Sequence, residues 1–164
     1  MSSDALVFLK DEHNQMRRLF HEFEQAKDDA HRGETVTAII EALTAHTYIE
    51  NECLYPEVRR LLPDLDSDIL ESYEEHHVAD VLTMELATMR PTDEHFEAKT
   101  TVLIENVKHH MEEEESEWFP KVREGLGRKQ LQELGEQLMA LRKQAPTRPP
   151  DPKAQKSARD AVSS

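Results

Sequence analysis

Two stretches of the chain carry the same arrangement of residues that bind metals. Residues 46–56 read HTYIENECLYP, and residues 110–120 read HMEEEESEWFP. Each stretch opens with His, places Glu four residues later, and ends with a large apolar residue, an aromatic residue and Pro. Because residues four apart lie on one face of an α-helix, each stretch presents an imidazole and a carboxylate on the same side.

Four long helices are predicted to position these residues. Apolar residues recur at alternating steps of three and four, which is the pattern of amphipathic helices, over residues 4–29, 35–62, 66–89 and 93–124. Pro56 should kink the second helix, and Pro63 should end it. Leucines at helical spacing within residues 131–143 indicate a further helix that could cap the bundle.

Length and composition favour an all-α fold. The chain has 164 residues and four Gly, which suits long helices joined by short connections in an up-down-up-down four-helix bundle. We assign residues 1–127 to the bundle, 128–144 to a short additional helix and 145–164 to a disordered tail rich in Pro, Lys and Ser. The stretch DEHNQMRRLFHEFE near the N-terminus resembles EEHHVADVLTMELA in the third helix. This similarity and the two repeated stretches indicate a repeat of helix pairs with rough two-fold symmetry.

Charge and cysteine content narrow the class of protein. The net charge of −14 disfavours nucleic acid and anionic membranes as partners, because both attract basic surfaces. The sequence has neither a membrane-spanning apolar stretch nor the pattern of a signal peptide at its start. The single Cys53 excludes an intrachain disulfide, so we expect a cytoplasmic protein with Cys53 as a small buried side chain. The acidic surface or the tail could bind a reductase or another protein, and both a monomer and a homodimer fit the sequence.

Each predicted helix has one His on or near its buried side, and these are His13, His46, His76 and His110. Glu50 and Glu114 lie on the same stripes, where a carboxylate is costly unless it is paired or bound to a cation. Four neutral imidazoles and two carboxylates would carry a charge of −2, which partly neutralises two divalent ions and leaves a position open. Nitrogen and oxygen donors suit iron or manganese, and the absence of a thiolate disfavours structural zinc.

A single His on an apolar stripe is usually a hydrogen-bonded core residue, but four of them with two Glu favour a metal site. His77 competes with His76 for the inner position, because its spacing from the apolar residues of the third helix also fits. The phrase EEHH, aligned with DEH in the first helix, favours His76. The remaining histidines are predicted to lie at the surface: His21, His31, His95 and His109.

The order of these residues resembles the hemerythrin-like, or HHE cation-binding, family over about residues 4–124. The matching elements are His13, His46-x-x-x-Glu50, Glu75-His76 and His110-x-x-x-Glu114. The resemblance implies a four-helix bundle with a non-haem di-iron centre, in which the four His are ligands and the two Glu bridge the irons. It also implies O2, peroxide or nitric oxide as the small molecule that is bound.

The chain departs from the oxygen carriers of that family at two places. These carriers have a second His four residues after the His of the third helix, where this chain has Asp80. Their fourth helix has a His and an Asp five apart, whereas His110 and Glu114 are four apart. Simple oxygen carriage is therefore disfavoured, and Asp80 becomes a candidate for a seventh ligand or for a base beside the centre.

We therefore expect a di-iron redox protein with catalase-like consumption of peroxide, and as the alternative an oxygen or iron sensor, binder or store without turnover. Manganese could replace iron at one position, because the same ligands suit both metals. The residues that could lie beside the open position or support the ligands are Asp80, Glu115, Tyr73 and Tyr48. In contrast, we interpret four residues as packing or helix-end positions: Tyr55, Pro56, Phe119 and Pro120.

Overall fold

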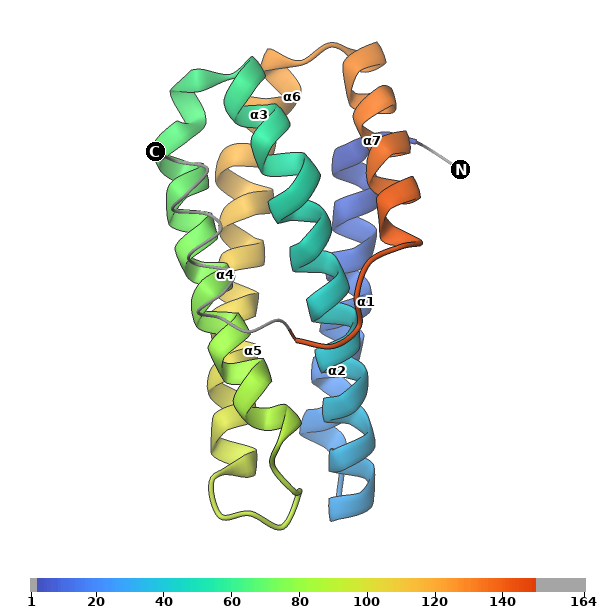
Figure 1. Ribbon diagram of the computed structural model, residues 1–164, viewed down its shortest axis with the longest axis vertical. Helices are drawn as coiled ribbons and strands as arrows, with labels where there is room; N and C mark the ends of the chain where they lie inside the picture. The colour runs from blue at the N-terminus through green and yellow to red at the C-terminus, as the bar shows by residue number, and fades with distance from the viewer. Residues whose placement is uncertain (1–2, 150–164) are drawn as a thin grey trace.

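A computed structural model describes residues 3–149 and shows an all-helical bundle (Figure 1). Its helical elements are α1 (Ala5–Gln25), α2 (Asp29–Ile49), η1 (Glu50–Leu54), α3 (Tyr55–Leu61), η2 (Pro63–Leu65), α4 (Asp66–Ala87), α5 (Phe96–Glu113), η3 (Glu114–Trp118), α6 (Phe119–Gly125) and α7 (Arg128–Arg142). The second bundle helix is the run α2–η1–α3, and the fourth is α5–η3–α6. The predicted four-helix bundle with an additional C-terminal helix is confirmed. Residues 150–164, most of the predicted disordered tail, lie outside the described residues.

The first connection lies earlier in the chain than predicted. α1 ends at Gln25 and α2 begins at Asp29, whereas the sequence placed these ends near residues 29 and 35. The cause is Asp28, whose carboxylate accepts a hydrogen bond of 2.7 Å from the backbone N–H of His31 and so caps α2. The residues between the two predicted helices therefore form the first turns of α2.

Each repeated stretch contains a π-helical turn that begins at its Glu. The backbone N–H of Tyr55 donates to the carbonyl of Glu50, and that of Phe119 donates to the carbonyl of Glu114. These bonds span five residues, whereas those of an α-helix span four. The sequence predicted only a kink at Pro56, and the structure places a π-helical turn immediately before it. As a result, the aromatic residue five positions after each Glu turns toward the same side as that Glu.

Two clusters of buried apolar side chains fill the bundle, with a polar layer between them. One cluster contains Leu9 of α1 and Ile69 of α4, and the other contains Phe20 of α1 and Leu86 of α4. Along each bundle helix, the residues of one cluster precede the inner His and those of the other follow it, except that Met111 belongs to the cluster that precedes His110. The fold thus places the four histidines at one level of the molecule.

α7 runs alongside α1 and does not cap the end of the bundle as predicted (Figure 1). Its buried face adds Leu131, Leu134 and Leu138 to the cluster that contains Leu9. Gly135 permits the close approach, because a Cβ there would lie 1.6 Å from the carbonyl oxygen of Ser3. The close contact at Gly135 therefore fixes the position of α7 against the start of α1.

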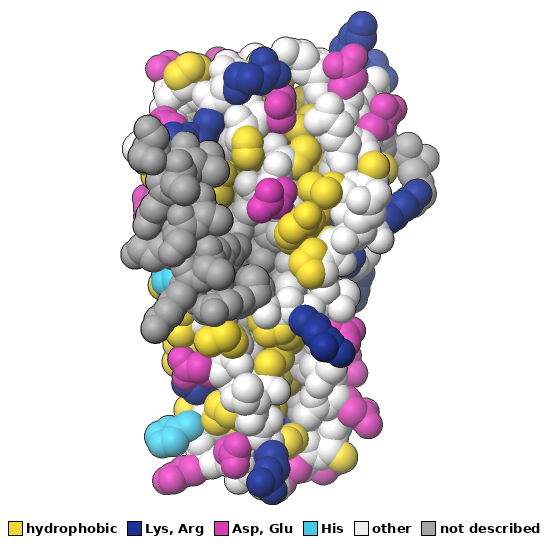
Figure 2. Space-filling view, viewed as in Figure 1, with side chains coloured by type: hydrophobic (Ala, Val, Ile, Leu, Met, Phe, Trp, Pro, Cys, Tyr) yellow, Lys and Arg dark blue, Asp and Glu magenta, His cyan; other side chains and the backbone are white. Residues whose placement is uncertain are grey.

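The surface mixes charged and apolar side chains. On the face shown in Figure 2, acidic and basic side chains are interspersed and do not gather in one basic patch. Cys53 is half-buried beside α7, more exposed than the small buried side chain that the sequence predicted. None of the described helices has the length and apolar character needed to cross a membrane.

Candidate metal centre

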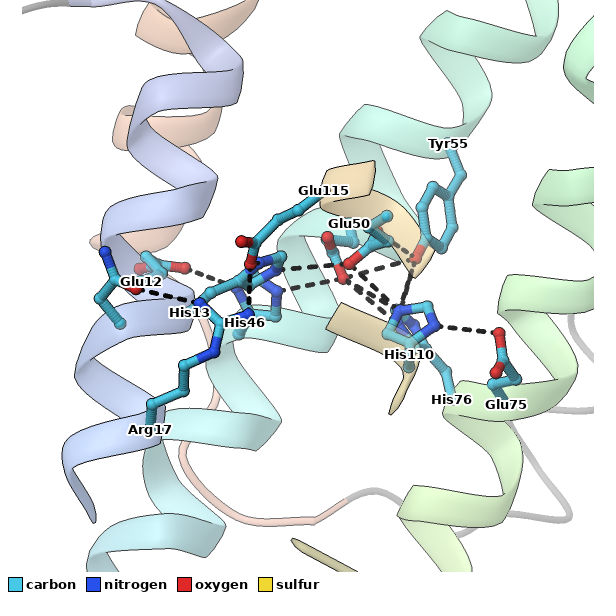
Figure 3. Close-up of polar contacts among 12 residues, drawn as sticks. Glu12, His13, Arg17, His46, Glu50, Tyr55, Glu75, His76, His110 and Glu115 are labelled. Atoms are coloured by element: carbon cyan, nitrogen blue, oxygen red, sulfur yellow. Dashed lines mark hydrogen bonds and ion pairs between the residues drawn. The ribbon is translucent and has the colours of Figure 1, made fainter. Parts of the chain in front are cut away.

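The four predicted histidines meet in the polar layer, one from each bundle helix. His13, His46, His76 and His110 are at most 6% exposed, and the structure places His76 there in preference to His77. They form two pairs, with ring centroids 4.9 Å apart for His13 and His46 and 4.7 Å apart for His76 and His110. In both pairs, the Nε2 atoms face the space between the two pairs (Figure 3).

Glu50 and Glu114 are fully buried between the two pairs of histidines. Glu50 Oε1 lies 3.2 Å from Nε2 of His46 and 3.1 Å from Nε2 of His76. Glu114 Oε1 lies 3.3 Å from Nε2 of His13 and 3.2 Å from Nε2 of His110. Each carboxylate therefore contacts one His of each pair, as a carboxylate that bridges two ions would.

The donor atoms of the six residues form two groups that could each hold a cation. One group is His13, His46, Glu50 and Glu114, and the other is Glu50, His76 and His110; within each group the atoms lie within 4.8 Å of one another. Among the described residues, four buried atoms of these side chains make no well-aligned hydrogen bond, although the contacts above bring a polar atom close to all of them but Glu50 Oε2: His13 Nε2, His46 Nε2, Glu50 Oε2 and Glu114 Oε1. Such atoms are costly to bury unless a cation satisfies them, so the residues fit two bound ions.

A hydrogen bond from Nδ1 fixes the ring of each His (Figure 3). The partners are Glu115 for His13 at 2.7 Å, Glu12 for His46 at 2.8 Å, Asn51 for His76 at 2.7 Å and Glu75 for His110 at 3.0 Å. These bonds leave Nε2 as the nitrogen that can bind an ion, an arrangement typical of metal-binding histidines.

Of these four supporting residues, the sequence predicted only Glu115. Glu12, Asn51 and Glu75 were missed, although each is adjacent in the sequence to a predicted ligand. Each of them supports a His on another helix. The apolar periodicity of one helix does not show which residues of a second helix it contacts. A polar residue next to each ligand was the signal that could have identified them.

Tyr55 has more contacts in the centre than the packing role predicted for it. Its phenol oxygen lies 3.1 Å from His76 Nε2, 3.3 Å from His110 Nε2, 3.1 Å from Glu114 Oε2 and 3.4 Å from Glu50 Oε1. Burial and the charges of Glu114 and Glu50 raise the pKa of Tyr55 well above its ordinary value, so the phenol keeps its proton in the metal-free protein. Its oxygen could give the group of Glu50, His76 and His110 a fourth donor.

The remaining predicted residues lie farther from the centre. The Tyr73 hydroxyl donates a hydrogen bond of 3.2 Å to the backbone carbonyl of Asn51. This carbonyl receives no hydrogen bond from Pro56, because Pro has no backbone N–H. Tyr48 packs, partly buried, against the apolar cluster that contains Leu9. Asp80 is buried one turn after His76, but none of the groups of potential metal-binding donor atoms among the described residues includes it.

In the metal-free protein, protons balance the charge of the two carboxylates. Burial alone would lower the pKa of His46, but the charge of Glu50 and the hydrogen bond to Glu12 raise it to about 10. His110 likewise has a pKa well above its ordinary value, because the charge of Glu114 and hydrogen bonds to nearby carboxylates outweigh burial. His76 differs, since burial and the charge of His110 lower its pKa. A cation that enters the centre must displace the protons of the first two rings.

A cavity of about 130 Å³ reaches the centre between α2, α4 and α5. His46, His76 and His110 line its inner part, and most of the remaining lining is apolar, from Leu43, Val78, Ala79, Val107 and Met111. A small molecule could reach the ions through this cavity.

Known proteins resemble this chain at the level of both sequence and fold. A family model described as the hemerythrin HHE cation-binding domain matches residues 4–122. A curated relative, a DNA nickase from Nostoc sp. PCC 7120, is 29% identical over 131 residues, which are 80% of this chain but only 37% of that protein. The crystal structure of a hemerythrin HHE cation-binding domain-containing protein from Mycobacterium kansasii superimposes with a TM-score of 0.74 over 86% of both chains, at 22% identity. The family match spans the four bundle helices and all six predicted ligands, so the chain belongs to the hemerythrin HHE cation-binding domain family.

Proposed function

We propose that this chain holds two iron ions and uses them to consume hydrogen peroxide. The observation that carries the proposal is the placement of Glu50 and Glu114, because each carboxylate lies near one His of each pair. Donors of nitrogen and oxygen without a thiolate suit iron. They also suit manganese, and a mixed centre of the two metals would use the same six residues.

Bound iron would supply the electron transfers of the reaction. Dismutation converts two H2O2 into two H2O and one O2, and two ions that each change by one electron can take up and return the electron pair. The overall reaction consumes no external reductant. A reductase partner would be needed only for a reaction that stops at peroxide reduction.

The residues of the chain would orient the ligands of the ions and limit the access of water. Each His is fixed through Nδ1, so its Nε2 can face an ion without reorientation. Tyr55 keeps its proton and donates a hydrogen bond of 3.1 Å to Glu114 Oε2, which holds this carboxylate in its orientation. The two apolar clusters on either side of the polar layer limit the access of water.

A second function, the binding or sensing of O2 or nitric oxide without turnover, is favoured by the cavity. Its lining is mainly apolar, and O2 and nitric oxide are less polar than hydrogen peroxide. The two functions differ in turnover: a sensor binds its ligand stoichiometrically, whereas an enzyme consumes many equivalents.

The test combines metal content, the visible spectrum and oxygen evolution after addition of hydrogen peroxide. We expect about two irons per chain, as six ligands for two ions imply, and sustained evolution of O2. His110→Ala and Glu50→Ala should abolish both the metal content and the oxygen evolution. His21→Ala, which removes an exposed imidazole from α1 away from the centre, is the matched control and should leave both unchanged. Two irons with a stable spectral change and no O2 would support the sensor, and a chain that retains no iron after reconstitution would exclude both functions.

The nicking activity is named for a relative of which this chain matches little more than a third, so that activity can belong to a part of the relative outside the match. The net charge of −14 also opposes binding to DNA.

A further inference from the structure

The end of α7 is connected to the metal centre by two consecutive hydrogen bonds. Arg142 Nε donates to Glu12 Oε2 at 2.8 Å, and Glu12 Oε1 accepts from His46 Nδ1 at 2.8 Å. Glu12 is only 9% exposed, so few water molecules can replace either bond. The contact joins residues 130 positions apart, and Arg142 lies outside the four helices that carry the ligand candidates.

We propose that Arg142 is a positioning residue of the metal centre, which fixes the ring of His46 through Glu12 and makes α7 a functional part of the site. This inference requires that the centre binds a cation, but it does not depend on peroxide turnover.

The geometry explains why both bonds are needed. Each oxygen of the Glu12 carboxylate has one partner, so the carboxylate cannot turn without breaking one of the two bonds. The fixed oxygen holds the proton of His46 on Nδ1 and leaves Nε2 for the ion. Without Arg142, Glu12 could rotate toward solvent, and the His46 ring would lose its fixed orientation.

A related arrangement occurs at His13 within the bundle, where a single carboxylate oxygen makes both contacts. Arg17 Nη2 donates to Glu115 Oε2 at 2.6 Å, and this carboxylate oxygen lies 2.7 Å from His13 Nδ1. His76 is held by the neutral amide of Asn51 instead. The carboxylates that support His13 and His46 are therefore each paired with an arginine. Because His76 has a neutral partner instead, the two positions should differ in their affinity for an ion.

The packing of α7 places Arg142 at the required position. Leu138, one turn earlier, is fully buried against the core, and Gly135 contacts the backbone of Ser3. This packing brings the guanidinium of Arg142 within hydrogen-bond distance of Glu12 on the neighbouring α1. This packing couples the position of a fifth helix to a ligand of the second.

The experiment titrates the metal-free full-length chain with Co(II), whose d–d absorption reports the ligands around it. Arg142→Gln should weaken the binding of one of the two ions by about tenfold, the lower end of the range for residues that support ligands, and should alter the absorption of that ion. Arg142→Lys should restore part of the affinity, because it keeps the charge but not the planar donor group. Lys129→Gln removes the same charge from an exposed position on α7 and should change neither property.

A double-mutant cycle separates this role from a general effect on stability. If Arg142 acts through Glu12, Arg142→Gln should have no further effect on Co(II) affinity in a Glu12→Gln background. An equal loss in both backgrounds would overturn the proposal, and so would an Arg142→Gln titration identical to that of the original protein. A chain that binds Co(II) normally but does not consume peroxide would contradict the proposed function and leave this inference to be judged by the cycle alone.

Discussion

Tyr55 contacts both carboxylates of the centre, a role that the sequence did not predict for it. Its oxygen contacts both Glu50 and Glu114 and lies beside His76 and His110. The corresponding residue of the other repeated stretch, Phe119, stacks on His13 with ring centroids 5.9 Å apart and has no hydroxyl. The two halves of the centre therefore have similar shapes but different chemistry.

Tyr55→Phe should weaken one ion position while the bundle stays folded. The ring still fills its place in the core, but the oxygen beside His76 and His110 is removed. We expect the affinity for one of the two ions to fall by about tenfold or more, with a matching loss of peroxide consumption. Metal titration and oxygen evolution measure the two effects. Tyr48→Phe removes a hydroxyl from a residue packed in the apolar cluster, and equal losses in the two variants would contradict a specific role for Tyr55.

The six ligand candidates could be predicted because they follow α-helical spacing. His46 and Glu50 are four apart on one helix, and so are His110 and Glu114, so their shared face is visible in the sequence. The same spacing placed Cys53 on that face. A π-helical turn rotates the following residues and brings Tyr55 to the centre instead, and α-helical periodicity does not contain that information.

Asp80→Asn should leave the metal content unchanged. The sequence raised Asp80 as a seventh ligand, but the structure keeps it outside both groups of donor atoms. We therefore expect about two ions per chain in this variant, the number that the two groups could hold, whereas Glu50→Gln should lose metal. Metal analysis of the two purified variants distinguishes them. A clear loss of metal in Asp80→Asn would restore Asp80 as a ligand candidate.

At the scale of elements, the sequence predicted the four long helices of the bundle, apart from the first connection, but not the position of α7. The second repeated stretch lies in the fourth bundle helix, as its apolar periodicity indicated. The position of α7 could not be predicted, because leucines at helical spacing show that a helix has a buried face but not which surface covers it. The contact of Gly135 with Ser3 and the hydrogen bond of Arg142 to Glu12 settle that position.

Gly135→Ala tests the close packing of α7 on α1. Helix propensity alone would favour Ala by about 1 kcal/mol. A Cβ would, however, lie 1.6 Å from Ser3 O and 2.9 Å from Ala5 N, which are backbone atoms that cannot move aside. We expect a net loss of about 1–3 kcal/mol in the free energy of unfolding, the usual cost of overpacking. Chemical denaturation measures it, with the exposed neighbour Glu136→Ala as control. A variant more stable than the original chain would show that α7 is not held at this contact.

At the scale of the whole molecule, a layer of charged side chains divides the apolar core in two. Two buried carboxylates and four imidazoles separate the cluster around Leu9 from the cluster around Phe20. Without a cation, protons on the histidines balance the charge of the carboxylates, and several polar atoms make no well-aligned hydrogen bond among the described residues. The stability of the bundle should therefore depend on both the cation and the pH.

Cation binding should stabilise the protein more at higher pH. The pKa of His46 is raised from 6.5 to about 10 in the metal-free protein, so its contribution to stability is complete below 6.5 and is lost as the pH rises toward 10. A cation must displace this proton, which becomes easier over the same range, so the metal-bound form gains where the metal-free form loses. At a free Co(II) concentration of about 100 times the dissociation constant, the gain in the free energy of unfolding should be about 2.7 kcal/mol.

Thermal melts with Co(II) and with a chelator should therefore differ more at a pH of about 8.5 than at about 6.5, at equal Co(II) concentration. His21→Ala, which removes an exposed imidazole from α1, should behave like the original chain. A difference that shrinks with rising pH would show that protons do not occupy the cation positions.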